Sequence, residues 1–158
     1  MHAVGHPLRD VPVCQSCGFV FWQNPKPTVS VLIHRDGAVL LVRRGVEPRK
    51  GMWDTPGGFM SPGELPEETA RREIMEELGL DVHLRGPVLF LTGSYGDDGE
   101  PVLDIYYMGA ITQDPQVVQD DVMEVRWFSL DHLPEEIGFP HTRTALETVR
   151  RMLKEGRI

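Results

Sequence analysis

The first half of the chain alternates short apolar runs with turn residues. Two apolar runs, residues 29–33 and 38–42, flank an Asp36-Gly37 dipeptide. Asp-Gly readily takes the positive φ values of a tight turn, so the two runs predict a β-hairpin. Residues 44–63 then hold five glycines and three prolines. This composition predicts a loop, with a short extended piece around residues 53–55.

A helix pattern follows the loop. Residues 66–78 are rich in good helix formers, Pro66 suits the first helical turn, and Gly79 lies just past the end. The natural N-cap position holds Leu65, which has no side-chain acceptor and forgoes about 1 kcal/mol of capping. We therefore predict a helix over residues 66–78 whose start depends on tertiary packing.

The second half of the chain predicts further strands and a closing helix. Residues 88–91 and 102–111 are apolar and β-branched, and the glycine-bounded turn at 96–99 between them indicates a second hairpin. Residues 125–128 predict one more strand, and residues 142–154 have the apolar spacing of an amphipathic helix. The order of elements predicts a mixed α/β fold, with helices covering a mixed or largely antiparallel sheet.

Composition narrows the class of protein. The chain has 158 residues, of which 41% are hydrophobic, and no apolar run approaches the roughly 18 to 20 residues of a membrane span. A single hydrophobic core is therefore expected. The formal net charge of −8 argues against nonspecific binding to nucleic acid or anionic membranes. Two cysteines and a start without signal-peptide features favour a reducing, cytoplasmic setting.

The predicted helix has an apolar edge and an acidic edge. At about 100° per residue, the first edge holds Ala70, Ile74 and Leu78, and the second holds Glu73, Glu76 and Glu77. Three neighbouring carboxylates repel one another by a few tenths of a kcal/mol per pair, roughly, whereas a divalent cation such as Mg²⁺ makes their proximity favourable. For a bare E-x-x-E-E sequence, a solvated acidic face is the alternative.

The residues upstream of this helix extend the pattern. The chain runs from Gly58 through five residues to Glu64, then through seven residues to Arg72-Glu73-Ile74-x-Glu76-Glu77-x-Gly79-Leu80. This arrangement resembles the box of the Nudix hydrolase family and matches each of its defining positions. The resemblance implies a Nudix α/β/α sandwich with a mixed, largely antiparallel sheet and the box helix on one face. It also implies hydrolysis, with Mg²⁺ or Mn²⁺, of a nucleoside diphosphate linked to another moiety: a nucleotide sugar, ADP-ribose, a dinucleotide or a nucleoside triphosphate.

The resemblance assigns roles to the box residues by position. Those expected at the metal are Glu73, Glu76, Glu77, Glu64 and the carbonyl of Gly58, and Arg72 is expected to orient the acids. The family takes its general base from the box or from a later loop. We therefore expect Glu73, Glu76, Arg72 and Glu124 to be catalytic, with Asp120 and Asp121 as rivals to Glu124.

The N-terminal residues carry a cysteine pair. Cys14 and Cys17 have the spacing of a zinc knuckle, but structural zinc takes four ligands. His2 and His6 are candidates to complete a Zn²⁺ site, and two reduced thiols are the alternative. Residues 14–27 resemble half of the zinc ribbon of NADH-pyrophosphatase-like Nudix members. We expect residues 1–27 to form an arm or reduced zinc-ribbon-like segment ahead of a Nudix domain at 28–158.

The substrate is less defined than the reaction. Arg44 is a candidate contact for phosphate, and Trp53 and Tyr95 are candidates to stack on a base, with core packing as the alternative for both rings. A non-catalytic nucleotide-binding or regulatory module is the alternative function, which the complete set of box acids disfavours. We expect a small-molecule partner, no nucleic acid or membrane partner, and a homodimer as in many members of the family.

Overall fold

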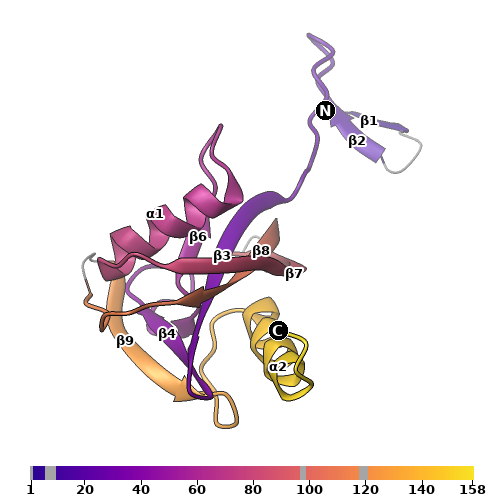
Figure 1. The fold of residues 1–158 in the computed structure, drawn as a ribbon. Helices are drawn as coiled ribbons and strands as arrows, with labels where there is room; N and C mark the ends of the chain where they lie inside the picture. Colours follow the sequence, from indigo (N-terminus) through magenta and orange to yellow (C-terminus); the bar gives the residue numbers. More distant parts are fainter. Residues whose placement is uncertain (1, 6–9, 97–98, 118–120) are drawn as a thin grey trace.

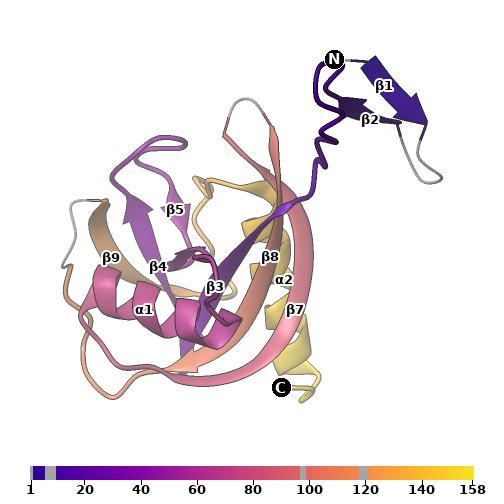
Figure 2. The ribbon, with the colours of Figure 1, turned by 90° about the horizontal axis from the view of Figure 1, so that it is seen from above.

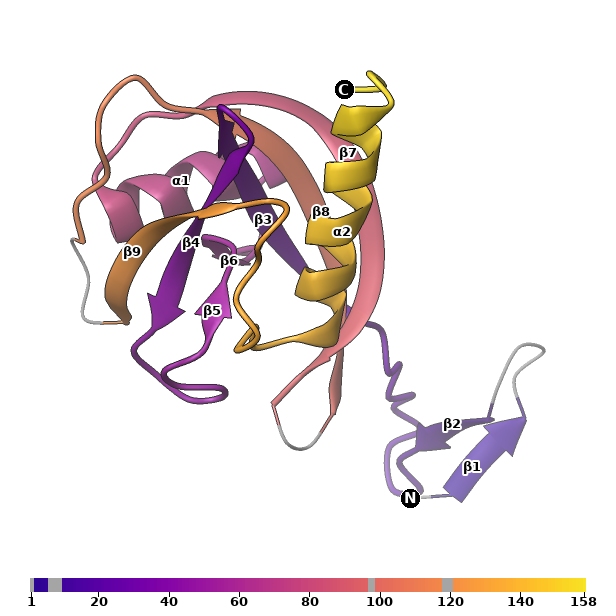
Figure 3. The ribbon, with the colours of Figure 1, turned by 90° about the horizontal axis from the view of Figure 1, so that it is seen from below.

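The computed structural model describes residues 2–5, 10–96, 99–117 and 121–158. In these residues a mixed sheet is covered by one helix on each side (Figure 1). Helix α1 (Pro66–Leu78) lies over one face, and helix α2 (Pro140–Lys154) lies over the other. Figure 3 shows α2 running beside strand β7 (His83–Tyr95). The predicted α/β sandwich is confirmed.

The hairpins predicted from the sequence are present. Strands β3 (Lys26–Arg35) and β4 (Ala38–Arg44) meet at the Asp36-Gly37 turn, where both residues have positive φ. Strands β7 and β8 (Glu100–Ala110) form the second hairpin, although β7 begins earlier than the apolar run at residue 88. The loop between β4 and α1 holds β5 (Trp53–Asp54) and β6 (Gly57–Phe59).

The sheet divides around β3. Its order is β5-β4-β3-β8-β7, with β6 also paired to β3 and β9 (Val122–Ser129) paired to β4. Strand β3 runs parallel to β8 over eight residue pairs, but it pairs with β4 only at His34 and Arg35. Over residues 28–30, β6 occupies the edge of β3 instead. The sheet therefore opens between β3 and β4, and the loop ahead of α1 enters that opening.

Two apolar cores lie on the two faces of the sheet. The core under α1 includes Ala70, Ile74 and Leu78, which are fully buried, as the helical pattern predicted. The core under α2 includes Ala145, Leu146 and Val149. Each helix is thus fixed by its apolar edge, and the acidic edge of α1 is directed away from that core.

The ends of α1 match the prediction closely. The helix spans the predicted residues, and Leu65 at the N-cap has no side-chain hydrogen bond. The carboxylate of Glu68 instead accepts the backbone N–H of Leu65 at 2.8 Å. Gly79 ends the helix in the left-handed conformation, with φ of 65°. Acidic residues in the first turn also suit the helix dipole, which offsets part of the missing cap.

The N-terminal residues form a separate two-stranded sheet. Strands β1 (His2–Gly5) and β2 (Asp10–Val13) pair with each other and with no strand of the main sheet among the described residues. Figures 1 and 2 both draw this pair apart from the helices and the main sheet. In the described part of the chain, no helix has the length and apolar character needed to span a membrane.

Candidate active site

A cavity of about 350 Å³ lies where the sheet opens between β3 and β4. Its walls come from the loop and β6 ahead of α1, the acidic edge of α1, strands β3, β4 and β8, the end of β7, the start of β9, and the first residues of α2. Cavities that hold drug-sized ligands begin at about 300 Å³, so this one has room for a nucleotide fragment. Its chemistry depends on the charged side chains in those walls.

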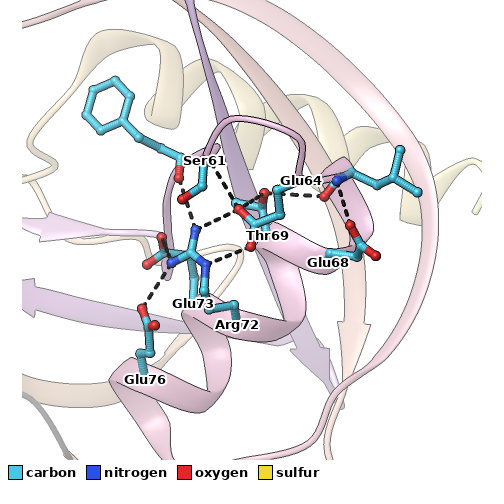
Figure 4. A network of polar contacts seen from close by, with 9 residues as sticks. Ser61, Glu64, Glu68, Thr69, Arg72, Glu73 and Glu76 are labelled. Carbon is cyan, nitrogen blue, oxygen red and sulfur yellow. Dashed lines mark hydrogen bonds and ion pairs between the residues drawn. The ribbon is translucent and has the colours of Figure 1, made fainter.

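Arg72 organises the acids of the loop and helix (Figure 4). Its guanidinium donates to both carboxylate oxygens of Glu64, at 2.8 and 3.0 Å. The same group donates to Glu73 at 2.7 Å, to Glu76 at 3.0 Å and to the carbonyl oxygen of Phe59 at 3.1 Å. Arg72 thereby lowers the pKa of Glu64 to about 2. One planar fork holds three carboxylates and the loop in a fixed arrangement.

Glu77 is the most buried acid of the helix. The residue is only 7% exposed, and its carboxylate accepts a hydrogen bond from the backbone N–H of Gly57 at 3.2 Å. Burial raises the pKa of Glu77 well above its ordinary value, and repulsion from Glu73 and Asp121 raises it further. Burial likewise raises the pKa of Glu73. Glu73, Glu77 and Asp121 line the cavity together. Three anions this close repel one another, and a bound cation would offset that repulsion.

The two glycines before α1 permit this close approach. A Cβ atom on Gly58 would lie 2.5 Å from Oε1 of Glu73, and one on Gly57 would lie 2.1 Å from the carbonyl oxygen of Val29. Gly57 also has φ of 149°, which disfavours any other residue. The backbone of this turn therefore lies directly against the acids, and a side chain there would displace them.

The box residues divide into two groups in the structure. Gly58, Arg72, Glu73 and Glu77 line the cavity. Glu64 and Glu76 are absent from its walls, and both are bound to Arg72. Among the described residues, no three acidic, histidine or cysteine side chains converge closely enough to enclose a metal ion as they stand. Glu64, Glu73 and Glu76 instead direct oxygens to the guanidinium of Arg72.

The downstream acids separate in the same way. Glu124 lies on β9, forms an ion pair with Arg126, and lies 3.7 Å from Arg43, outside the cavity. Asp121 lines the cavity, and its Oδ1 is buried with no hydrogen-bond partner among the residues that the structure describes. Asp120 lies outside the described residues. Among the downstream acids that the structure describes, Asp121 is the one placed with Glu73 and Glu77.

Of the expected substrate contacts, two lie in the cavity and one does not. Arg44 lines it and donates to the hydroxyl of Tyr95 at 3.2 Å and to Asp54 at 3.3 Å. Tyr95 lines it as well and stacks on Phe139, with ring centroids 5.5 Å apart. Trp53 is only 5% exposed and packs edge-on against Phe128 in the core under α2. This position favours the alternative of core packing that the sequence left open for this ring.

Sequence reasoning missed a second pair of acids. Asp54 and Asp104 line the cavity from the loop and from β8. Asp54 accepts the hydroxyl of Thr142 at 2.9 Å, and Asp104 accepts the hydroxyl of Ser30 at 2.9 Å. These partners lie 88 and 74 residues away in sequence, so no local pattern marks them. An acidic residue in an otherwise apolar strand, as at position 104, was the available signal.

The cysteine pair forms a tight turn. The backbone N–H of Gly18 donates to the carbonyl of Cys14 at 2.9 Å, and both Cys14 and Cys17 are free thiols. Within the described ranges, no cluster of three candidate ligands includes them. His6 lies outside the described residues. Zinc binding at this pair stays a prediction.

Comparison with known proteins identifies the family. A family model described as NUDIX domain matches residues 24–154. The chain belongs to the Nudix family. This Nudix chain is 32% identical over 131 residues to an ADP-ribose pyrophosphatase from Methanocaldococcus jannaschii, covering 80% of the chain and 75% of that relative. It is 31% identical over 126 residues to the NAD-capped RNA hydrolase NudC from Stutzerimonas stutzeri, covering 77% of the chain but 42% of that relative.

A solved Nudix structure supports the same assignment. The crystal structure of a MutT NUDIX hydrolase from Burkholderia pseudomallei matches with a TM-score of 0.72 and 32% sequence identity, covering 78% of this chain and 97% of that one. The family model and these relatives place the chain in the Nudix hydrolase family. It spans about half or less of the length of the NudC relatives that it matches.

Proposed function

We propose that this Nudix hydrolase cleaves a phosphoric anhydride bond in a nucleoside diphosphate linked to another moiety. The observation that carries the proposal is the meeting of Glu73, Glu77 and Asp121 with the Gly57-Gly58 turn in one cavity. A polyphosphate and a cluster of acids repel each other unless cations lie between them. The site therefore suits a substrate that binds with its cation.

The residues at the box end fit a divalent metal ion. The donors are carboxylates, of which Glu77 is buried and Glu73 half-buried, both with raised pKa values, and Asp121 adds a buried oxygen without a partner among the described residues. Oxygen-only donors favour Mg²⁺ or Mn²⁺. We propose that Glu73, Glu77 and the Gly58 carbonyl hold the ion. Glu76 and Glu64 join them only after their side chains turn toward the cavity, because both lie outside its walls and, like Glu73, are bound to Arg72.

Charge determines the reaction that such a site catalyses. When bound, a divalent ion neutralises phosphate charge and lowers the pKa of a coordinated water. Among the described residues, Asp121 has the free buried oxygen that can accept the water's proton, so we propose it as the general base in preference to Glu124. Arg72 keeps Glu73 and Glu76 in position through hydrogen bonds of 2.7 and 3.0 Å.

The relatives suggest the substrate class. One is named an ADP-ribose pyrophosphatase and others NAD-capped RNA hydrolases. We propose ADP-ribose, NADH and related dinucleotides as the first compounds to test, with Arg44 and Tyr95 near the nucleotide. NAD-capped RNA enters the test as well, because the net charge of −8 led us to expect no nucleic-acid partner.

Three expectations accompany this proposal. We propose that the Nudix domain spans residues 28–158 and that residues 1–27 form an appended arm. We also propose a cytoplasmic setting, which the two free thiols suit. A homodimer is our third expectation, and sedimentation analysis of the purified chain tests it.

The test is a release assay across substrate classes. The purified chain is incubated with Mg²⁺ and, separately, with nucleoside triphosphates, nucleotide sugars, ADP-ribose, NADH, dinucleoside polyphosphates and NAD-capped RNA. We expect turnover of at least one compound, abolished by EDTA and restored by Mg²⁺ or Mn²⁺. The Glu77→Gln variant is the matched inactive control. Binding without turnover across the whole panel would instead support the alternative, a non-catalytic nucleotide-binding module.

A further inference from the structure

The hydrolysis proposed for the Nudix box acids does not explain a second pair of acids in the same cavity. Asp54 and Asp104 line the same cavity as the box acids, yet they lie on the face of the sheet that α2 covers. Asp104 is 3% exposed. Two buried carboxylates at this end are energetically unfavourable, so their hydrogen bonds indicate what each one does.

Asp54 is fully engaged by the protein. Its Oδ1 accepts the Thr142 hydroxyl and the backbone N–H of Thr55, each at 2.9 Å. Its Oδ2 lies 3.3 Å from the Arg44 guanidinium. Arg44 in turn lies over the rings of Tyr95 and Phe139. Asp54 therefore acts within the protein, by joining the loop, α2 and Arg44 into one wall.

Asp104 has one oxygen to spare. Its Oδ2 accepts the Ser30 hydroxyl at 2.9 Å, whereas its Oδ1 is buried with no hydrogen-bond partner among the described residues. The hydroxyls of Thr55, which also lines the cavity, and of Tyr106, two residues along β8, lack a partner in the same ranges. Burial raises the pKa of Asp104, and the nearby Tyr106 hydroxyl and His141 oppose that rise. An unsatisfied buried polar group costs about 1–3 kcal/mol, and native proteins usually reserve such groups for a ligand or water.

The charges of the cavity orient a bound nucleotide. Phosphate oxygens are repelled by Asp104, whose end of the cavity has no free arginine or lysine in the described part of the chain, because the nearby Arg44 is already bound to Asp54 and Tyr95. The phosphate oxygens are expected instead beside Gly58, Glu73 and Glu77, the residues proposed to hold a divalent ion. The stacked rings of Tyr95 and Phe139 supply an apolar surface in the same cavity. An uncharged hydrogen-bond donor is the partner that the free oxygen of Asp104 can accept.

We propose that Asp104 is a specificity-determining residue, whose Oδ1 accepts a hydrogen bond from the uncharged part of the substrate. The donor is a ribose hydroxyl or a nucleobase N–H. This inference rests on the proposed function, since it places the phosphates at the box end. Ser30 holds the Asp104 carboxylate in position from β3, through the parallel pairing of β3 with β8.

Affinity for nucleoside monophosphates tests this without requiring turnover. Calorimetry on the unmodified chain first finds which of AMP, GMP, CMP and UMP binds most tightly. Its 2′-deoxy, 3′-deoxy and base N-methylated analogues follow, each lacking one donor. We expect at least one analogue to bind at least about tenfold more weakly, the loss of one hydrogen bond to a charged group. A loss with a deoxy analogue identifies ribose, and a loss with the methylated base identifies the base edge.

A variant connects that preference to the residue. Asp104→Asn keeps the shape, but its single carbonyl oxygen is needed to accept the Ser30 hydroxyl, which turns an NH2 donor toward the position of Oδ1. We therefore expect it to erase the difference between the parent nucleotide and the weak analogue. For a hydrolysed substrate, KM rises about tenfold while kcat changes little. Asp114→Asn, an exposed position on the loop after β8, is the matched control and keeps the wild-type preference.

Two results would overturn the inference. The first is equal affinity of the unmodified chain for all analogues, which needs no variant to fold. The second is an unchanged preference in folded Asp104→Asn protein, which would leave Asp104 as a residue of the core beside Tyr106. Failure of the proposed function looks different: no compound of the release assay is hydrolysed, whatever the monophosphate affinities are.

Discussion

The backbone N–H of Gly57 donates a hydrogen bond to Oε2 of Glu77 at 3.2 Å, across 20 residues of sequence. This contact joins β6 to α1 where the cavity wall is bare backbone, because neither Gly57 nor Gly58 has a side chain. The loop and the acidic helix edge therefore form one unit, and changes on either side of the contact affect the other.

Substitutions at the two glycines are expected to have different effects. Gly57→Ala places a Cβ 2.1 Å from the Val29 carbonyl oxygen at φ of 149°, so we expect it to lower the free energy of unfolding by about 1–3 kcal/mol. For Gly58→Ala the nearest atoms are the carboxylate of Glu73, a side-chain end rather than backbone. This substitution should leave stability nearly unchanged while turnover falls at least about tenfold. Urea unfolding and kcat measurements check both, and wild-type turnover in Gly58→Ala would contradict the arrangement.

Neutralising Glu77 separates stability from activity. Glu77→Gln removes a buried charge that Glu73 and Asp121 repel, so we expect the metal-free protein to unfold at the same or a higher temperature. Turnover in saturating Mg²⁺ should fall by orders of magnitude, about 10² or more, and Glu73→Gln should behave alike. Thermal unfolding with and without Mg²⁺ is the second measurement. Mg²⁺ should raise the unfolding temperature of the wild type but not that of the variant. Near wild-type rates would refute the assignment.

Asp121 and Glu124 form a matched pair for locating the general base. Asp121 lines the cavity with a free buried oxygen, and Glu124 is paired with arginines on β4 and β9. We expect Asp121→Asn to lower kcat about 10²–10⁴-fold. Glu124→Gln should retain most activity. The reverse order of the two variants would return the role to Glu124.

Asp54 gives the stability of the protein a dependence on pH. Burial raises its pKa to about 6 from an ordinary 3.8, against the favourable effect of Arg44. Below about pH 4 the carboxyl is protonated in both states, and between about pH 4 and 6 only the unfolded chain releases the proton. Ionisation of Asp54 therefore lowers stability as pH rises from about 4 to 6, by up to about 3 kcal/mol.

The variant Asp54→Asn measures that dependence. Because asparagine does not ionise, the free energy of unfolding of the variant relative to wild type should rise between about pH 4.5 and pH 7.5. The loss of the Arg44 contact shifts both values alike and does not alter this trend. Asp81→Asn, at an exposed position after α1, is the matched control for the substitution itself. A parallel pair of stability curves for Asp54→Asn and wild type would disprove the raised pKa.

Local sequence patterns predicted the helices and strands, but they did not predict which distant segments contact one another. The helix at 66–78 and the hairpin around Asp36-Gly37 follow from spacing and turn chemistry that lie within a few residues. The burial of Glu77 could not be inferred, since it depends on a loop that turns back onto the helix. For Trp53 and Tyr95, the sequence left stacking and core packing open, and only the fold separates the two rings.

The candidate site shows the same division. Gly58, Arg72 and Glu73 belong to one short stretch of sequence that resembles the Nudix box, so the acidic end of the cavity could be predicted from that resemblance. Asp104 meets Ser30 only because β3 and β8 run parallel, 74 residues apart. A parallel pair needs a long connection, so its contacts leave no periodic signal in the sequence.

The parallel pairing of β3 with β8 also determines when the cavity can form during synthesis. Residues 26–33 gain their parallel partner in the sheet only once residues 102–109 have been synthesised. A nascent chain that ends soon after Leu80 already has every box residue but lacks β8, β9 and α2. High contact order of this kind slows folding, since loop closure precedes the stabilising contacts. A ribosome-bound fragment of that length would therefore carry the complete motif and have no enclosed site for a nucleotide.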